Sequence, residues 1–170
     1  MARIDHIEIM MIDLPPKVVR TDAIQSFVSQ ETPIVRITDQ DGQTGTGYSY
    51  TIGTGGKAIV SLLKETLAPL LIGREAEEIE RLWSDLLFST HATAVGAITS
   101  LAIGAIDIAL WDLRCRRAGL PLWQLAGGFK RSVPLYSTEG GWLHIPINEL
   151  VEDAVSVKEA GFAGSKIKIG

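Results

Sequence analysis

Residues 94–117 read AVGAITSLAIGAIDIALWDLRCRR, and this stretch decides the fold of the first part of the chain. It is apolar on nearly every side until its basic end, and Gly119 and Pro121 follow, as is typical where a helix stops. Its apolar part is long enough to cross a membrane, but Asp107 and Asp112 interrupt it. We therefore predict the most buried helix of this part of the chain and no membrane association.

Before this helix the sequence predicts a small antiparallel sheet. Residues 3–14 and 33–39 are rich in Ile and Val, which favour strands. The pair Asp41-Gly42 then precedes residues 44–50 and is typical of a hairpin turn. These segments predict a three-stranded antiparallel meander.

Two further helices are predicted between the sheet and residue 94. From Gly55 onward, apolar residues recur every three or four positions until a break at Pro69 and Gly73. A second amphipathic segment runs from about Glu75 to Phe88. Residues 1–128 are thus expected to form an α+β domain that joins the meander to a helical bundle.

After residue 128 the pattern changes to strand, helix, strand. Residues 132–137 and 164–169 are predicted strands, and residues 147–160 are a predicted helix with Asn148 at its N-cap. This order is typical of a parallel sheet, which normally has both faces covered. Because nothing in the sequence covers this unit, we expect the chain to be the first part of a longer protein.

Composition excludes several classes of function. Lys and Arg number 16 against 20 Asp and Glu, which gives a formal net charge of -4 without a basic run. Nucleic acid is therefore not an expected partner, because its binding requires a source of positive charge. The single cysteine, Cys115, excludes an intramolecular disulfide and a cysteine-rich metal site, and a cytoplasmic location is expected.

The sharpest candidate for chemistry is the segment Lys166-Ile167-Lys168. Side chains alternate along a strand, so both lysines are predicted on one face, about 6.6 Å apart along the strand. Repulsion between the two ammonium groups, strengthened by a low-dielectric environment, favours loss of a proton, and one amine would then act as a base. Alternatively, both lysines simply face solvent.

Four segments together resemble the mandelate racemase and muconate lactonizing enzyme branch of the enolase superfamily. They are AIDIALWD (105–112), GLPL (119–122), PLYS (134–137) and GFAGSKIKIG (161–170). The resemblance implies a capping domain over residues 1–128. It also implies that residues 129–170 are the first β-α-β of an incomplete TIM-like (β/α) barrel, truncated after the second strand.

This resemblance implies abstraction of the proton α to a carboxylate by a racemase or dehydratase, with Mg²⁺ stabilising the enediolate intermediate. Lys168 matches the general base, and Lys166 matches its partner, which contacts the carboxylate of a hydroxy acid or acid sugar. The family's metal ligands lie on later barrel strands, so we assign no metal ligand and expect this chain alone to be inactive. We expect the full-length protein to be a homo-oligomer.

Two loops resemble the family's specificity elements. They are residues 17–31 and GYSYTIG (47–53), and the second contains Tyr50. Tyr50 either contacts the substrate or packs at a strand end. Thr138, just past the first barrel strand, is a second candidate for binding a substrate oxygen.

Other features are given structural interpretations. The glycines of residues 45–47 and 53–56 are interpreted as turn glycines, because they lack the context of a phosphate-binding loop. Asp107 and Asp112 are expected to satisfy neighbouring donors or pair with arginine. His6 and His91 are expected to be ordinary surface or packing residues. Trp83, Trp111 and Trp123 lie in apolar segments and are expected to pack in the core.

Two alternatives to this interpretation remain open. In the first, the chain is a non-catalytic capping and assembly module that binds a partner. The second keeps the barrel but makes Lys168 a nucleophile that forms a Schiff base.

Overall fold

The computed structural model describes residues 2–93 and 96–169 of the chain. It consists of two compact units. The first contains residues 1–14 and 29–128, and the second contains residues 15–28 and 129–170. The segment 15–28 therefore leaves the first unit in mid-chain and belongs to the second.

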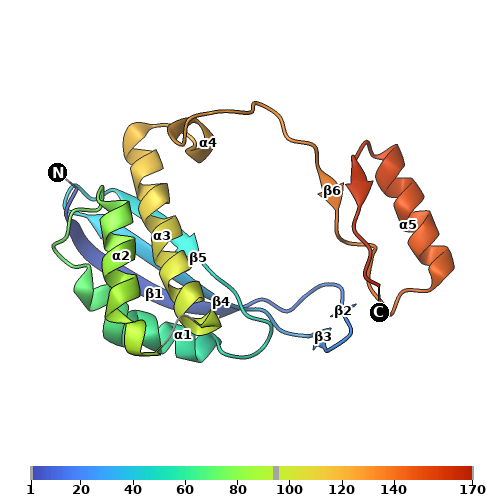
Figure 1. Ribbon diagram of the computed structural model, residues 1–170, viewed down its shortest axis with the longest axis horizontal. Coiled ribbons are helices and arrows are strands. Elements are labelled where there is room, and N and C mark those ends of the chain that lie inside the picture. The colour runs from blue at the N-terminus through green and yellow to red at the C-terminus, as the bar shows by residue number, and fades with distance from the viewer. Residues whose placement is uncertain (1, 94–95, 170) are drawn as a thin grey trace. The chain divides into compact units, whose positions relative to one another are not determined.

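The first unit contains the predicted three-stranded meander. Its strands are β1 (Ile4–Asp13), β4 (Glu31–Asp39) and β5 (Thr44–Tyr48), in the antiparallel order β1-β4-β5 (Figure 1). Their register places Ile37 between Ile7 and Gly45. The predicted sheet is confirmed.

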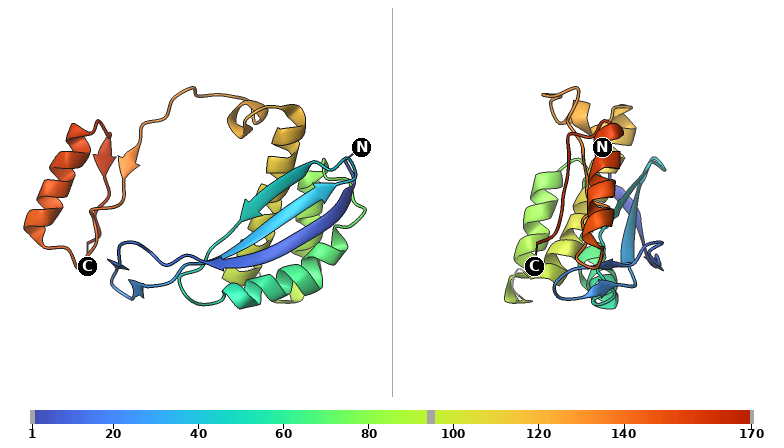
Figure 2. Two further views of the ribbon diagram at one scale, coloured as in Figure 1. Left: turned by 180° about the vertical axis from the view of Figure 1, so that it is seen from behind. Right: turned by 90° about the vertical axis from the view of Figure 1, so that its right-hand side faces the viewer.

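Helices cover one face of this sheet, as the two views of Figure 2 show. In chain order the helical elements of the first unit are α1 (Gly56–Leu62), the π-helical turn Leu63–Leu67, the 3-10 turn Ala68–Leu70, α2 (Ile79–Ser89), the 3-10 turn His91–Thr93, α3 (Ala97–Ala118) and α4 (Leu122–Leu125). The long helix ends at Gly119 as predicted. Its predicted start at Ala94 lies outside the described residues.

Helix α2 begins four residues later than predicted, and backbone pairing is the reason. Glu75 forms an isolated antiparallel bridge with Arg3, and the N–H of Ala76 donates to the carbonyl of Ala2 at 2.8 Å. This segment therefore extends the start of β1 and is not available to the helix, which starts at Ile79.

Helix α3 packs directly on strand β5 through two glycines. A Cβ added to Gly45 would lie 2.2 Å from the carbonyl oxygen of Ala109, and one added to Gly47 would lie 2.1 Å from that of Ala105. The interpretation of Gly45 and Gly47 as turn glycines is therefore wrong: they lie in β5 and allow close contact between two backbones. Gly53 and Gly55 do adopt the positive φ of turn glycines (76° and 94°).

The core of the first unit lies between the sheet and the helices. Its largest fully buried side chains come from both layers and are Ile4, Val35, Ile37, Ile59, Leu63, Leu67, Leu71, Leu82, Leu86, Ile106, Leu110 and Leu113. Helix α3 supplies the last three, but Ile98 and Ile108 on its other side are exposed. Among the described residues, helix α3 has more buried residues than any other helix, as predicted, although it is not buried on all sides.

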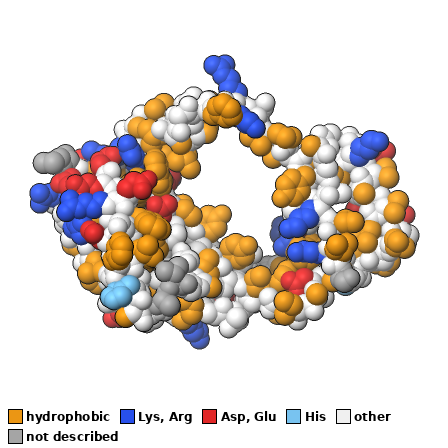
Figure 3. All heavy atoms as spheres, in the orientation of Figure 1, with side chains coloured by type: hydrophobic (Ala, Val, Ile, Leu, Met, Phe, Trp, Pro, Cys, Tyr) orange, Lys and Arg blue, Asp and Glu red, His pale blue; other side chains and the backbone are white. Residues whose placement is uncertain are grey.

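A network of ion pairs joins the β4–β5 turn to the end of α3. The buried Asp39 accepts hydrogen bonds from the backbone N–H groups of Asp41 and Gln43, and Arg117 bridges Asp39 and Asp41. These two carboxylates raise the pKa of Arg117 above its ordinary value, Asp41 having the larger effect. Acidic and basic side chains gather on this end of the unit, near the N-terminus (Figure 3).

The second unit consists of a short hairpin and a parallel β-α-β unit. The hairpin pairs β2 (Arg20–Thr21) with β3 (Ser26–Phe27) and was not predicted. The β-α-β unit contains β6 (Tyr136–Ser137), α5 (Ile147–Glu159) and β7 (Gly164–Ser165), with β6 and β7 parallel.

Two details of the β-α-β unit differ from the prediction. Both strands are shorter than expected, because β6 and β7 pair only with each other over two residues. Asn148 is not the N-cap, because α5 already begins at Ile147 and the N-cap position is Pro146. Within the described part of the chain, no helix combines the length and the apolar character needed to span a membrane.

Candidate active site

The segment Lys166-Ile167-Lys168 follows directly after β7 in the second unit. The backbone N–H of Lys166 donates to the carbonyl of Ser137 at 2.8 Å, so the parallel pairing continues one step beyond the strands. The N–H of Lys168 donates to the carbonyl of Gly141 at 2.7 Å. The two lysines thus lie at the carboxyl end of a parallel strand pair, where α/β enzymes place their catalytic groups. Lys166 is exposed and Lys168 is half-buried.

The loop after β6 contacts this segment without a side chain between them. A Cβ added to Gly141 would lie 2.0 Å from the carbonyl oxygen of Lys166 and 2.6 Å from the Cα of Ile167. Only glycine fits this approach, because any larger residue would push the two backbones apart. Gly141 therefore fixes where the lysine segment runs.

Trp142 stands at the centre of the side chains around Lys168. The Nζ atom of Lys168 lies 5.4 Å from the centroid of the indole ring, and the guanidinium carbon of Arg20 lies 6.0 Å from it. Phe27 meets the same ring edge to face, with centroids 5.4 Å apart and an interplanar angle of 87°. The buried Nε1 atom of Trp142 has no hydrogen-bond partner among the described residues.

The β2–β3 hairpin is tied to the loop after β6 by two further contacts. Arg20 donates to Glu139 from Nη2 at 2.6 Å and from Nε at 3.3 Å. The N–H of Leu143 donates to the carbonyl of Thr21 at 3.3 Å. The hairpin and the lysine segment are thus parts of one site within the second unit.

Asp22 shapes the turn of this hairpin. Its carboxylate accepts hydrogen bonds from the N–H groups of Ile24 at 2.8 Å and Gln25 at 2.9 Å. The N–H of Gln25, then that of Ile24, and to a smaller degree the charge of Lys168 lower the pKa of Asp22 below its ordinary value. These hydrogen bonds and the positive charge of Lys168 thus favour the ionised form of Asp22.

The other predicted site residues are exposed. Thr138 follows β6, and its hydroxyl makes no hydrogen bond among the described residues. Tyr50 belongs to the first unit, where 52% of its surface is exposed. The loop that carries Tyr50 is anchored by Glu31, whose carboxylate accepts from the Thr51 hydroxyl and the Gly56 N–H, both at 2.8 Å.

The sequence reasoning missed Trp142, Arg20 and Phe27. Their contacts join positions more than a hundred residues apart, and periodicity carries no information on such pairs. One signal was available: an aromatic residue directly after Gly140-Gly141, in the loop at the carboxyl end of a predicted strand. Such loops carry function in parallel α/β folds.

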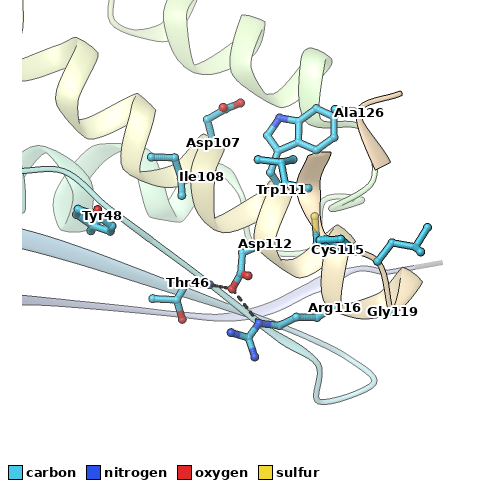
Figure 4. Close-up of a pocket in the computed structure, with 13 residues that line it drawn as sticks. Thr46, Tyr48, Asp107, Ile108, Trp111, Asp112, Cys115, Arg116, Gly119 and Ala126 are labelled. Carbon is cyan, nitrogen blue, oxygen red and sulfur yellow. Dashed lines mark hydrogen bonds and ion pairs between the residues drawn. The ribbon is translucent and has the colours of Figure 1, made fainter. Parts of the chain in front are cut away.

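The first unit has a separate open groove of about 1060 Å³ beside α3 (Figure 4). Apolar residues that line it include Ile108, Trp111 and Leu122. Asp112 accepts from the backbone N–H of Thr46 at 2.8 Å and from Arg116 at 2.9 Å, as the dashed lines show. The expected role of Asp112 is thus confirmed.

Asp107 also lines this groove but has a different environment. Its side chain makes no hydrogen bond or ion pair among the described residues, contrary to the prediction. Partial burial, and next the charge of Glu80, raise its pKa above the ordinary value. Trp83 and Trp123 also differ from the predicted packing, because 44% and 47% of their surfaces are exposed.

The described residues do not form a site for Mg²⁺. Over residues 2–93 and 96–169 no group of three or more His, Cys, Asp or Glu side chains is placed to hold a metal ion. Mg²⁺ prefers several oxygen ligands in octahedral geometry, and the lysines and aromatic rings around Trp142 do not supply them. No catalytic step through a metal is therefore assigned to these residues.

The sequence matches known proteins over most of its length. Residues 6–127 match the family model for the N-terminal domain of mandelate racemase / muconate lactonizing enzyme. The 3,6-anhydro-alpha-L-galactonate cycloisomerase of Streptomyces coelicolor is 38% identical over 165 residues, which are 96% of this chain and 45% of that enzyme. The L-talarate/galactarate dehydratase of Salmonella typhimurium is 38% identical over 81% of this chain and 34% of its own.

Solved structures agree with this match. The Salmonella typhimurium L-talarate/galactarate dehydratase, liganded with Mg and L-lyxarohydroxamate, superposes with a TM-score of 0.90 at 33% identity, covering 99% of this chain and 44% of its own. A racemase from Streptomyces coelicolor with bound magnesium gives a TM-score of 0.91 at 36% identity, with coverage of 98% and 47%.

The chain therefore spans less than half the length of these relatives. Its antiparallel sheet with covering helices corresponds to the N-terminal capping domain of the matched family. Because residues 6–127 match this family model and the chain is more than 30% identical to these relatives, the chain belongs to the mandelate racemase/muconate lactonizing enzyme family of the enolase superfamily.

Proposed function

We propose that the complete protein abstracts the α-proton of an acid sugar or hydroxy acid through an enediolate intermediate. The observation that carries this proposal is the position of Lys166 and Lys168 at the carboxyl end of the β6–β7 pair. The identity to the L-talarate/galactarate dehydratase of Salmonella typhimurium favours dehydration of an acid sugar over racemisation.

We further propose that residues 129–170 begin a (β/α) barrel and that residues 1–128 form the capping domain. The parallel β6-α5-β7 unit supports this assignment, because a barrel of this type is built from such units in succession. The assignment of segment 15–28 to the second unit supports a capping loop that contributes to the active site.

Each candidate residue has a defined task in this proposal. Lys168 takes the α-proton on Nζ, and the electron pair of the broken C–H bond moves into the carboxylate to form the enediolate. Lys166 binds that carboxylate by charge. Thr138 and Tyr50 bind substrate oxygens. In a dehydratase the electron pair of the enediolate then forms the Cα–Cβ double bond, and the β-hydroxyl takes a proton from a general acid of the complete protein and leaves as water. Mg²⁺ belongs to the complete protein, on ligands outside the described residues.

The test is α-proton exchange into D₂O by a protein that carries the complete barrel, in the presence of Mg²⁺ and a panel of sugar acids. Lys168→Ala should slow exchange by roughly 10²–10⁴-fold, which is the usual contribution of a general base. Lys158→Ala is the matched control, because Lys158 lies in the last turn of α5. Exchange at the wild-type rate in Lys168→Ala would show that another group is the base.

A further inference from the structure

Lys168 is held at two points by one dipeptide. Its backbone N–H donates to the carbonyl of Gly141 at 2.7 Å, and its Nζ lies 5.4 Å from the ring centroid of Trp142. The hydrogen bond fixes the backbone of Lys168, and the contact with the ring fixes the position of Nζ at the end of its flexible side chain. A lysine side chain that is free in solution has many rotamers, so two such points restrict its position strongly.

The indole ring that holds Lys168 is itself held by the β2–β3 hairpin. Phe27 packs edge to face on the ring, within the range of favourable aromatic pairs. Arg20 lies 6.0 Å from the same centroid, and its ion pair with Glu139 anchors it to the loop that carries Trp142. Any movement of the hairpin would therefore move the ring.

An aromatic ring suits a base better than a carboxylate would. It attracts a cation through its quadrupole but offers no lone pair that would compete for the protons on Nζ. Other charged groups around the site are Arg20, Asp22, Glu139 and Lys166. Within the described residues, none of them forms a hydrogen bond or ion pair with the Lys168 side chain. Among the described residues, Trp142 is thus the side chain with a defined contact to Nζ.

We propose that Trp142 is a positioning residue, which holds the amine of Lys168 in place and makes that placement depend on the hairpin Arg20–Phe27. The proposal rests on the proposed function only for the role of Lys168 as the base. The contact itself can be tested without catalysis.

The contact is tested by ¹⁹F NMR of the chain labelled with 5-fluorotryptophan. The four tryptophan signals are assigned by single Trp→Phe substitutions. Lys168→Met should shift the Trp142 signal and leave those of Trp83, Trp111 and Trp123 in place. Lys166→Met is the matched control and should leave the Trp142 signal in place. An unchanged Trp142 signal in Lys168→Met would overturn the proposal.

The functional arm uses the complete protein with Mg²⁺. Trp142→Leu should lower kcat for α-proton exchange by about 10²-fold, the cost of a misplacement of about 1 Å, with little change in KM. Trp142→Phe keeps a ring face and should restore most of the rate, which a merely structural defect would not predict. Trp123→Leu, an exposed residue of α4, should match the wild type.

The outcomes separate the two proposals. Wild-type exchange together with an undiminished kcat in Trp142→Leu overturns the positioning role alone. Loss of kcat in Trp142→Leu that Trp142→Phe does not relieve also overturns it. Absence of exchange in the wild-type complete protein overturns the proposed function, while the ¹⁹F shifts still report whether the contact exists.

Discussion

Single residues in this chain differ in how much their role depends on distant partners. Lys166 and Lys168 were identified from a short local pattern and its resemblance to a family, and the structure places both at the end of β7. Trp142 was not identified, because its neighbours Arg20 and Phe27 come from the other end of the chain. Local spacing predicts which residue types can do chemistry, whereas the side chains that hold them follow from tertiary packing.

Asp107 provides a residue-scale prediction on pH. Its pKa in the folded chain is above the unfolded value, so the folded state binds this proton more tightly. Its contribution is therefore most favourable at low pH and is lost as the pH rises from the ordinary carboxyl value, 3.8, through the raised pKa. Asp107→Asn should stabilise the chain at pH 7 by about 0.5 kcal/mol, since water screens this half-exposed group.

Urea unfolding at pH 7 and at pH 4 measures this effect, and the gain should shrink at the lower pH. Asp112→Asn is the matched comparison on the same helix. It should destabilise the chain, because the Asp112 carboxylate accepts from Thr46 and Arg116. A loss of stability at pH 7 in Asp107→Asn would contradict the role given to burial.

At the scale of elements, local sequence patterns predicted most helices and strands, and tertiary contacts changed some of their bounds. Ile and Val content and the Asp41-Gly42 turn located β1, β4 and β5. The recurrence of apolar residues every three or four positions located α1, and the long apolar run before Gly119 located α3. The β2–β3 hairpin escaped prediction because two residues per strand are too few to show a period. The start of α2 was displaced by backbone pairing between Glu75 and Arg3, which no local pattern reveals.

The contact between α3 and β5 gives an element-scale prediction. Gly47→Ala should cost about 3 kcal/mol in the free energy of unfolding, because the new methyl group would overlap the backbone of α3 at Ala105 and Ala109. Gly104→Ala is the control on α3 itself. Its Cβ would meet nothing within 4 Å, so it should stabilise the helix by about 0.5–1 kcal/mol.

Both variants are compared by urea unfolding followed by circular dichroism. Both substitutions add one methyl group. Opposite signs of the change in the free energy of unfolding would therefore show that the room available at each position, and not the methyl group itself, determines the effect. Equal midpoints for Gly47→Ala and the wild type would show that α3 does not lie this close to β5.

At the scale of the whole molecule, the family match covers the capping domain. The described residues do not include a group of side chains that could bind a metal ion. We expect the chain of 170 residues to show no stoichiometric heat of Mg²⁺ binding in calorimetry at millimolar Mg²⁺. A protein with the complete barrel should bind Mg²⁺ under the same conditions. A stoichiometric site in the shorter chain would place metal ligands where none is assigned.

The ion pair between Arg20 and Glu139 joins residues 119 positions apart. Translation proceeds from the N-terminus, so the hairpin Arg20–Phe27 is synthesised long before Trp142 and cannot form its contacts with Trp142 until then. Closing so long a loop costs entropy that local contacts do not repay, and such contacts form late. We therefore expect the contacts of Trp142 with Arg20, Phe27 and Lys168 to form after the capping sheet and its helices have folded.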